Sequence, residues 1–139
     1  MSAKQAAEIG RVRNVVADKV TETFLSHHPD WIQRYGDRAR IRGVEDARHH
    51  IDFLQAAVDL DEPEEFADYA LWCAEVLESR GIAEVFLIEN LEAIREELRG
   101  RISHSAQMAV ASAISAGLDA LTELVDLSTS GITPPPVPA

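Results

Sequence analysis

The stretch that decides the fold is "RYGDRARIRGVEDARHHIDFL", residues 34–54. Its first nine residues hold four arginines, and an Asp and a His pair follow them. Apolar side chains recur three or four positions apart through this stretch and beyond it, which is the spacing of one helix face. The pattern predicts a long helix over about residues 37–60.

Five more helices are predicted around this segment. Glycine and proline are sparse before the C-terminal tail and mostly separate the periodic segments. Pro63, followed by acids, opens one helix, and Gly81 closes it. The expected helices cover about residues 3–27, 30–36, 63–80, 83–98 and 103–127. The predicted fold class is therefore all-α, with one domain over residues 1–128 and a Pro-rich tail or linker over 129–139.

Composition argues against several classes of function. A chain of 139 residues with a net charge of −11 lacks the basic surface of a general nucleic-acid binder. We find no secretory signal and expect no membrane-crossing segment, so the expected location is the cytoplasm. The single cysteine, Cys73, cannot form an internal disulfide or a multi-cysteine zinc site. No metal site and no enzymatic activity are predicted, because the sequence shows no catalytic or metal-ligand spacing.

The predicted helix over residues 37–60 has two unlike faces. At about 3.6 residues per turn, the expected core stripe comprises Ile41, Val44, Ala47, Ile51, Leu54 and Val58. The nearly opposite face comprises Arg42, Asp46, His49 and Phe53, with Arg38 and His50 beside them. A solvated face seldom needs a large aromatic in line with charged groups. Two interpretations follow: one side of a ligand pocket, or a solvated face on which Arg42 and Asp46 form an i,i+4 pair.

The fifty residues "YGDRARIRGVEDARHHIDFLQAAVDLDEPEEFADYALWCAEVLESRGIAE", 35–84, resemble the central helices of phycobiliproteins, light-harvesting proteins with a globin fold. The family pattern is Tyr-Gly, six residues, a Cys, then x-Arg-Asp-x-x-Tyr-Tyr and an apolar run ending in Gly-Asp-Pro. Tyr35 and Gly36 match its opening, Asp46 matches its Asp, and Glu62-Pro63 stand where Asp-Pro is usual. The resemblance implies a globin-like six-helix domain of phycobiliprotein type.

This chain departs from the family pattern at three places. Gly43 stands where the family carries its pigment-attaching Cys, so a thioether there is impossible. Glu45 replaces the Arg before the Asp, and His49-His50 replace the two Tyr. In length and pattern the chain most resembles the bilin biosynthesis-associated globins, bacterial relatives thought to accompany haem oxygenase and bilin reductases.

The resemblance implies non-covalent binding of a linear tetrapyrrole, either biliverdin or a reduced bilin. Asp46 would accept hydrogen bonds from the pyrrole N–H groups. One or more of Arg38, Arg40 and Arg42 would hold the propionates, because guanidinium binds planar carboxylates bidentately. The remaining candidate ligand contacts are Tyr35, His49, His50, Phe53, Tyr69 and Trp72. Either His could stack, hydrogen-bond or ligate iron, and Cys73 is expected to be a buried thiol without a thioether.

Two alternatives and several partners stay open. A haem-binding globin is the first alternative, although residues 63–80 contain no His for the proximal position. A ligand-free sensor or interaction domain is the second, with the Pro-rich tail as its linker. The partners that the resemblance implies are bilin-synthesis enzymes and a second copy of the chain, paired through the N-terminal helix, where Val15 adds to the apolar stripe.

Overall fold

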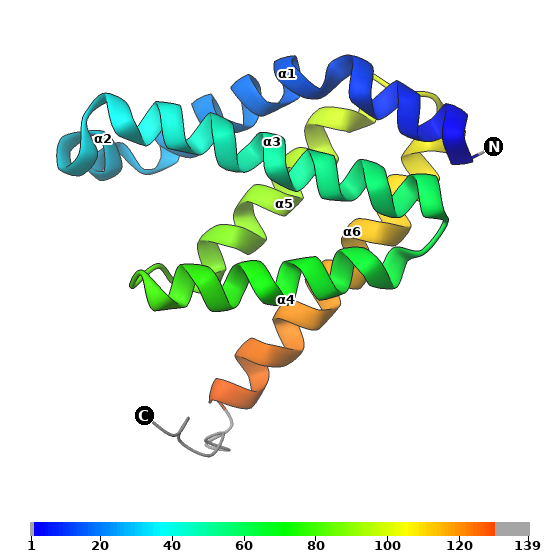
Figure 1. Cartoon of the computed structure of the whole chain (residues 1–139). Coiled ribbons are helices and arrows are strands. Elements are labelled where there is room, and N and C mark those ends of the chain that lie inside the picture. The colour runs from blue at the N-terminus through cyan, green and yellow to red at the C-terminus, as the bar shows by residue number, and fades with distance from the viewer. Residues whose placement is uncertain (1, 130–139) are drawn as a thin grey trace.

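The structure is a computed structural model that describes residues 2–129, and these residues form six α-helices (Figure 1). The helices are α1 (Ser2–His27), α2 (Pro29–Tyr35), α3 (Asp37–Leu60), α4 (Pro63–Ser79), α5 (Glu84–Arg99) and α6 (His104–Thr129). No strand occurs among these residues, so the all-α prediction is confirmed. Most of the predicted Pro-rich tail falls on residues 130–139, which lie outside the described part.

The helices form two layers. In Figure 1, α3 and α4 run antiparallel at the front, and α5 and α6 cross behind them. α1 packs along α3, and α4 packs mainly on α6, while the short α2 lies at the end of α3 far from the α3–α4 turn. The core fills the space between the layers; its largest side chains include Ile9, Val16, Val20, Ile51, Leu54, Phe66, Leu87, Leu91, Ile94, Leu98, Ile114 and Leu121. Each of these side chains contributes about 1.5–3 kcal/mol by leaving water.

Local sequence signals explain how the α3–α4 hairpin is made. Asp61 closes α3 in the left-handed region at φ 54°, and Pro63 follows in the first turn of α4. Gly81, at φ 77°, follows the end of α4, and the N–H of Ile82 donates to the carbonyl of Leu77 over 2.9 Å. This is the closure that the sequence predicted at Gly81.

The predicted core stripe of α3 is wrong at one end. Ile41 is 57% exposed, whereas Ala47, Ile51, Leu54 and Val58 are buried as expected. At about 100° per residue, Ile41 lies about 140° around α3 from Leu54, at the edge of the predicted stripe and outside the buried arc. The buried arc of α3 also extends toward α4 and includes His50 and Ala57.

The expectation that no segment could cross a membrane fails for α6 by length and composition. Residues His104–Val125 span 22 residues with a mean hydropathy of 1.4. Core helices of soluble proteins satisfy the same test. One face of α6 packs against α4 and α5, where Val110, Ile114 and Leu121 are buried.

Candidate functional site

The structure brings together five of the ten predicted site residues between the two helices at the front. From α3 they are Asp46, His50 and Phe53, and from α4 they are Tyr69 and Trp72; we call this set the α3–α4 face. These residues come together because α3 and α4 form an antiparallel hairpin, in which a short turn places the second half of α3 beside the first half of α4. Side chains of the two helices pack on each other within this set, since His50 and Phe53 of α3 both contact Tyr69 of α4.

Tyr69 is the centre of the α3–α4 face. Its ring stacks on Phe53, with centroids 4.1 Å apart and planes 12° from parallel. Trp72 lies beside it, with a centroid distance of 6.3 Å. Tyr69 is buried, whereas Phe53 is 49% exposed and Trp72 is 58% exposed. The stack therefore ends in uncovered aromatic surface, which is suited to a planar apolar ligand.

His50 forms the buried floor of the α3–α4 face. Its Nδ1 lies 2.7 Å from the Tyr69 hydroxyl, and the two rings meet nearly edge to face. Burial lowers the pKa of His50 to about 4, with a further contribution from His49, so the imidazole is neutral at pH 7. Burial also raises the pKa of Tyr69, assisted by Cys73 and Asp46. The pair is thus an uncharged, hydrogen-bonded support under the exposed rings.

Asp46 is the acidic group at the edge of this face. By surface area its side chain is exposed, yet enough protein surrounds the carboxylate that lost hydration raises its pKa. His49 and Arg42 on α3 and Arg80 after α4 oppose that shift. Within residues 2–129 no cation lies within 4.0 Å of Asp46 and no donor bonds to it, so the ordinary Arg42–Asp46 pair is not formed.

The three candidate arginines do not share one position around α3. Arg42 lies one turn before Asp46, and Arg38 lies one turn before Arg42 on the same side. Arg40 is two residues from each of these arginines, about 160° around the helix, and lies about 120° from Asp46, so it is on another side of α3. Sequence reasoning missed Arg80, which the antiparallel hairpin brings back from the end of α4 to the Asp46 region. The sequence could have indicated Arg80, because it lies at the end of the predicted helix over residues 63–80, just before Gly81. An antiparallel hairpin brings that end back to the first half of α3.

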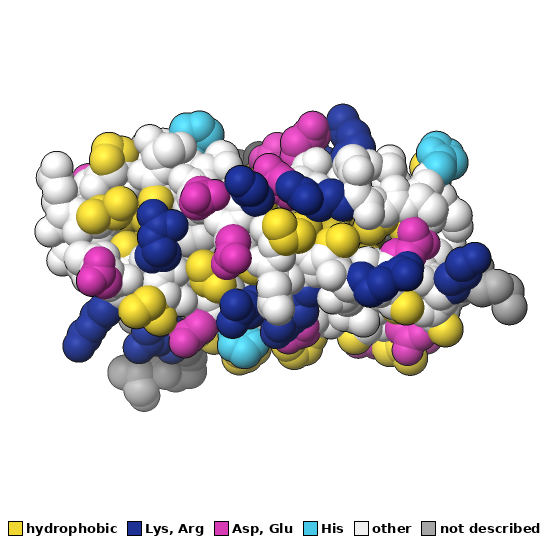
Figure 2. Space-filling view, turned by 90° about the horizontal axis from the view of Figure 1, so that it is seen from above, with side chains coloured by type: hydrophobic (Ala, Val, Ile, Leu, Met, Phe, Trp, Pro, Cys, Tyr) yellow, Lys and Arg dark blue, Asp and Glu magenta, His cyan; other side chains and the backbone are white. Residues whose placement is uncertain are grey.

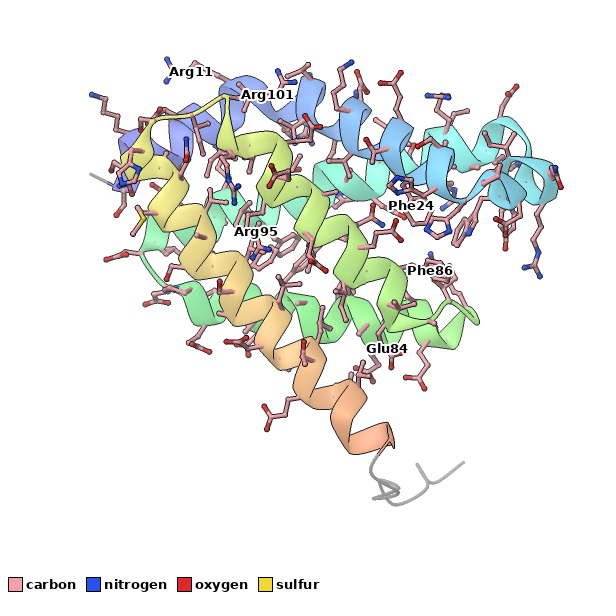
Figure 3. All side chains as sticks on the ribbon, turned by 180° about the vertical axis from the view of Figure 1, so that it is seen from behind. Arg11, Phe24, Glu84, Phe86, Arg95 and Arg101 are labelled. Carbon is pink, nitrogen blue, oxygen red and sulfur yellow. The ribbon has the colours of Figure 1, made fainter. Side chains whose placement is uncertain are left out.

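Tyr35 does not join the α3–α4 face. Its ring lies 5.7 Å from Trp31, and the Arg34 guanidinium lies 5.6 Å above it. Trp31 in turn belongs to an aromatic cluster at the junction of α1, α2 and α5 that also includes Phe24, His28 and Phe86. Figure 3 shows Phe24 and Phe86 at that corner. Tyr35 is therefore part of the corner that holds α2, and no contact links it to Asp46.

Gly43 lies where α3 approaches α1 closely. A β-carbon built there would come within 2.8 Å of Cγ2 of Thr21, which is buried. The position that carries the pigment-attaching Cys in the resembled family is therefore taken up by helix packing in this chain. Cys73, the one cysteine in the sequence, is buried, and burial raises the pKa of its thiol. Neither position presents a reactive thiolate.

Two hollows in the described surface lie away from the α3–α4 face. One, of about 340 Å³, lies between α1 and α5 and is lined by Thr23, Phe24, His27, Glu89, Asn90, Glu92, Ala93, Arg95 and Glu96. The other, of about 420 Å³, lies between α1 and α3 and is lined by Ala3, Ala6, Ala7, Asp52, Gln55, Ala56 and Asp59. Neither hollow is lined by a residue of the α3–α4 face. No group of three metal-binding side chains occurs in residues 2–129.

Comparison with known proteins adds no further assignment. No family model matches the sequence, and no curated protein gives a significant match. The likeness to phycobiliproteins rests on the residues quoted from positions 35–84.

Proposed function

We propose that this chain is a globin-like protein of phycobiliprotein type that binds a linear tetrapyrrole without a covalent bond on the α3–α4 face. The observation that carries the proposal is Asp46: its carboxylate is partly shielded from water, has no donor among residues 2–129, and lies next to exposed aromatic rings. A bilin supplies the missing donors through its pyrrole N–H groups.

The surroundings of Asp46 complement the other parts of a bilin. Phe53 and Trp72 offer flat apolar surface for the pyrrole rings. Arg42 and Arg38 on α3, with Arg80 after α4, are placed to meet the two propionates, and none of them is ion-paired within residues 2–129. Arg40 lies on another side of α3 and is left out of the proposal.

Reversible binding fits a carrier or an accessory factor in bilin synthesis. Position 43 has no thiol, and the Cys73 thiol is buried with a raised pKa, so both oppose a thioether. A protein that receives a bilin from one enzyme and delivers it to another needs such reversibility. Bilin-synthesis enzymes are the partners that this role implies.

The decisive experiment is a titration of the apoprotein with biliverdin, followed by visible absorbance. Asp46→Asn is expected to weaken binding by roughly ten- to a hundredfold, because a hydrogen bond to a charged group contributes about 1.5–3 kcal/mol. Glu45→Gln is the matched control: this neighbouring acid is exposed, and we expect it to bind like the wild type.

Parallel measurements separate the alternatives. Titration with haem that gives a spectral change, without any response to biliverdin, would favour a haem globin. No change with either pigment would favour a ligand-free interaction domain. A bilin that stays on the chain in a denaturing gel, seen by zinc fluorescence, would contradict non-covalent binding.

A further inference from the structure

Charge is distributed unevenly along the segment from α2 to the start of α4. The basic end is the stretch where α2 leads into α3, with Arg34, Arg38, Arg40 and Arg42 against one acid, Asp37. The acidic end comprises Asp59, Asp61, Glu62, Glu64, Glu65 and Asp68, at the α3–α4 turn. These two sets lie at opposite ends of α3, a helix of 24 residues and hence about 36 Å long. The chain as a whole is strongly acidic, so the basic end is a local exception.

The charges at both ends are exposed and unpaired within residues 2–129. None of the ion pairs there involves a residue of the basic or the acidic end. Elsewhere the chain does pair its basic side chains, as in Arg13 with Asp52 and Arg101 with Glu97. The two ends are too far apart to neutralise each other within one molecule.

An exposed ridge of α3 joins the two ends. Its members recur three or four residues apart and are all exposed: Arg38, Arg42, Glu45, His49, Phe53, Ala56 and Leu60. Phe53 is 49% exposed and Leu60 is 61% exposed, so the ridge is apolar toward the acidic end. No described helix lies in front of α3 in Figure 1. The top of the molecule, on the side of α1, is a different face, and Figure 2 shows Lys and Arg side chains interspersed with acidic and apolar ones there.

We infer that two copies of this chain pair antiparallel along the α3 ridge, about a two-fold axis near His49. In that arrangement the basic end of each copy lies on the acidic end of the other, and the contact is self-complementary as a two-fold interface requires. Phe53 and Leu60 supply apolar area between the two charged contacts. The net charge of −11 on each copy opposes association in any orientation that does not match opposite ends.

This inference does not rest on the proposed function, but the ridge shares Arg38, Arg42 and Phe53 with the proposed bilin surface, so pairing and bilin binding would compete. It is therefore tested on the ligand-free protein. Sedimentation velocity of the full chain at tens of micromolar is expected to show a dimer at low salt that dissociates at about 0.5 M NaCl. Two charge reversals define the interface: Arg38→Glu with Arg42→Glu, and Glu65→Lys with Asp68→Lys. Each reversed variant alone is expected to be monomeric, and an equimolar mixture of the two is expected to dimerise.

The mixture restores pairing because, at one of the two contacts, the acids introduced at positions 38 and 42 face the lysines introduced at positions 65 and 68, while the other contact keeps its native charges. The matched control is Arg11→Glu with Lys19→Glu, which makes the same charge change on the outer face of α1 and should leave the dimer intact. Circular dichroism of each variant verifies that it is folded. A monomeric wild type at low salt, or a mixture that stays monomeric, overturns the inference.

Two other outcomes also overturn it. Dissociation by the α1 control, with a dimer retained by Arg38→Glu/Arg42→Glu, would place the interface on the N-terminal helix. Species that grow beyond two copies with concentration would indicate open head-to-tail chains in place of a closed pair.

Discussion

At the residue scale, two titratable groups one turn apart on α3 are shifted in opposite directions by the same cause. Burial lowers the pKa of His50 to about 4, and partial burial raises the pKa of Asp46. Each shift disfavours the charged form. The difference lies in the partners: His50 has the Tyr69 hydroxyl at 2.7 Å, and Asp46 has no donor within residues 2–129. His50 therefore supports the α3–α4 face, and Asp46 is the group that we propose for the ligand contact.

The His50 shift predicts a pH-dependent stability. The unfolded chain protonates His50 near pH 6.5, while the native state does so near pH 4, so between these values the unfolded state binds more protons. The native-state advantage is fully present above pH 6.5 and is lost as the pH falls, by up to about 3 kcal/mol. His50→Asn should flatten the dependence of urea-unfolding free energy on pH in that window.

The control for this prediction is the exposed His104 on α6, which affects neither His50 nor Asp46. His104→Asn should leave the pH dependence close to that of the wild type. The raised pKa of Asp46 acts in the opposite sense, since it favours the native state as the pH falls, but all three proteins share it. Equal slopes for the wild type and His50→Asn would contradict the assignment.

At the scale of the element, α3 shows what the sequence could and could not predict. The helix ends were predictable, because Asp61, Pro63 and Gly81 act through local backbone geometry. The exposure of Ile41 was not, since the edge of the buried arc depends on which helices pack against α3. The approach of Arg80 to Asp46 likewise depends on the antiparallel return of α4. Periodicity identifies a face, and only the packing shows what covers it.

The close approach of α1 and α3 at Gly43 gives a second prediction. Gly43→Ala should destabilise the protein by about 1–3 kcal/mol despite the better helix propensity of alanine, because the new β-carbon meets the stiff, buried Thr21. Thermal or urea unfolding measures the change.

A second substitution, at Thr21, should restore most of the stability that Gly43→Ala loses. Thr21→Ser removes the clashing methyl group and keeps a hydroxyl for the bond that Thr21 donates to the Ala17 carbonyl, so the double variant should recover most of the loss. Gly100→Ala is the matched control, because nothing lies within 4 Å of a β-carbon there. A loss in Gly100→Ala as large as that in Gly43→Ala would show that the α1–α3 approach is not the cause.

At the scale of the whole molecule, the proposed ligand surface lies at the edge of the core and shares the buried His50 and Tyr69 with it. The core between the two layers is apolar, apart from the buried Thr21 and His50 among the described residues. The proposed ligand surface is the α3–α4 face, where side chains of both helices meet in one stack. A ligand bound there contacts both helices and needs the native hairpin. Binding should therefore raise the free energy of global unfolding.

Global unfolding therefore tests the proposed function by a readout independent of colour. Biliverdin at about a hundred times its dissociation constant should stabilise the native state by about 2.7 kcal/mol. For a domain of this size, that raises the unfolding midpoint by roughly 10 °C. Asp46→Asn at the same biliverdin concentration should gain only a few degrees, since its weaker binding leaves less of the native state saturated. Glu45→Gln should gain as much as the wild type, and an equal gain in Asp46→Asn would mean that the bilin binds elsewhere.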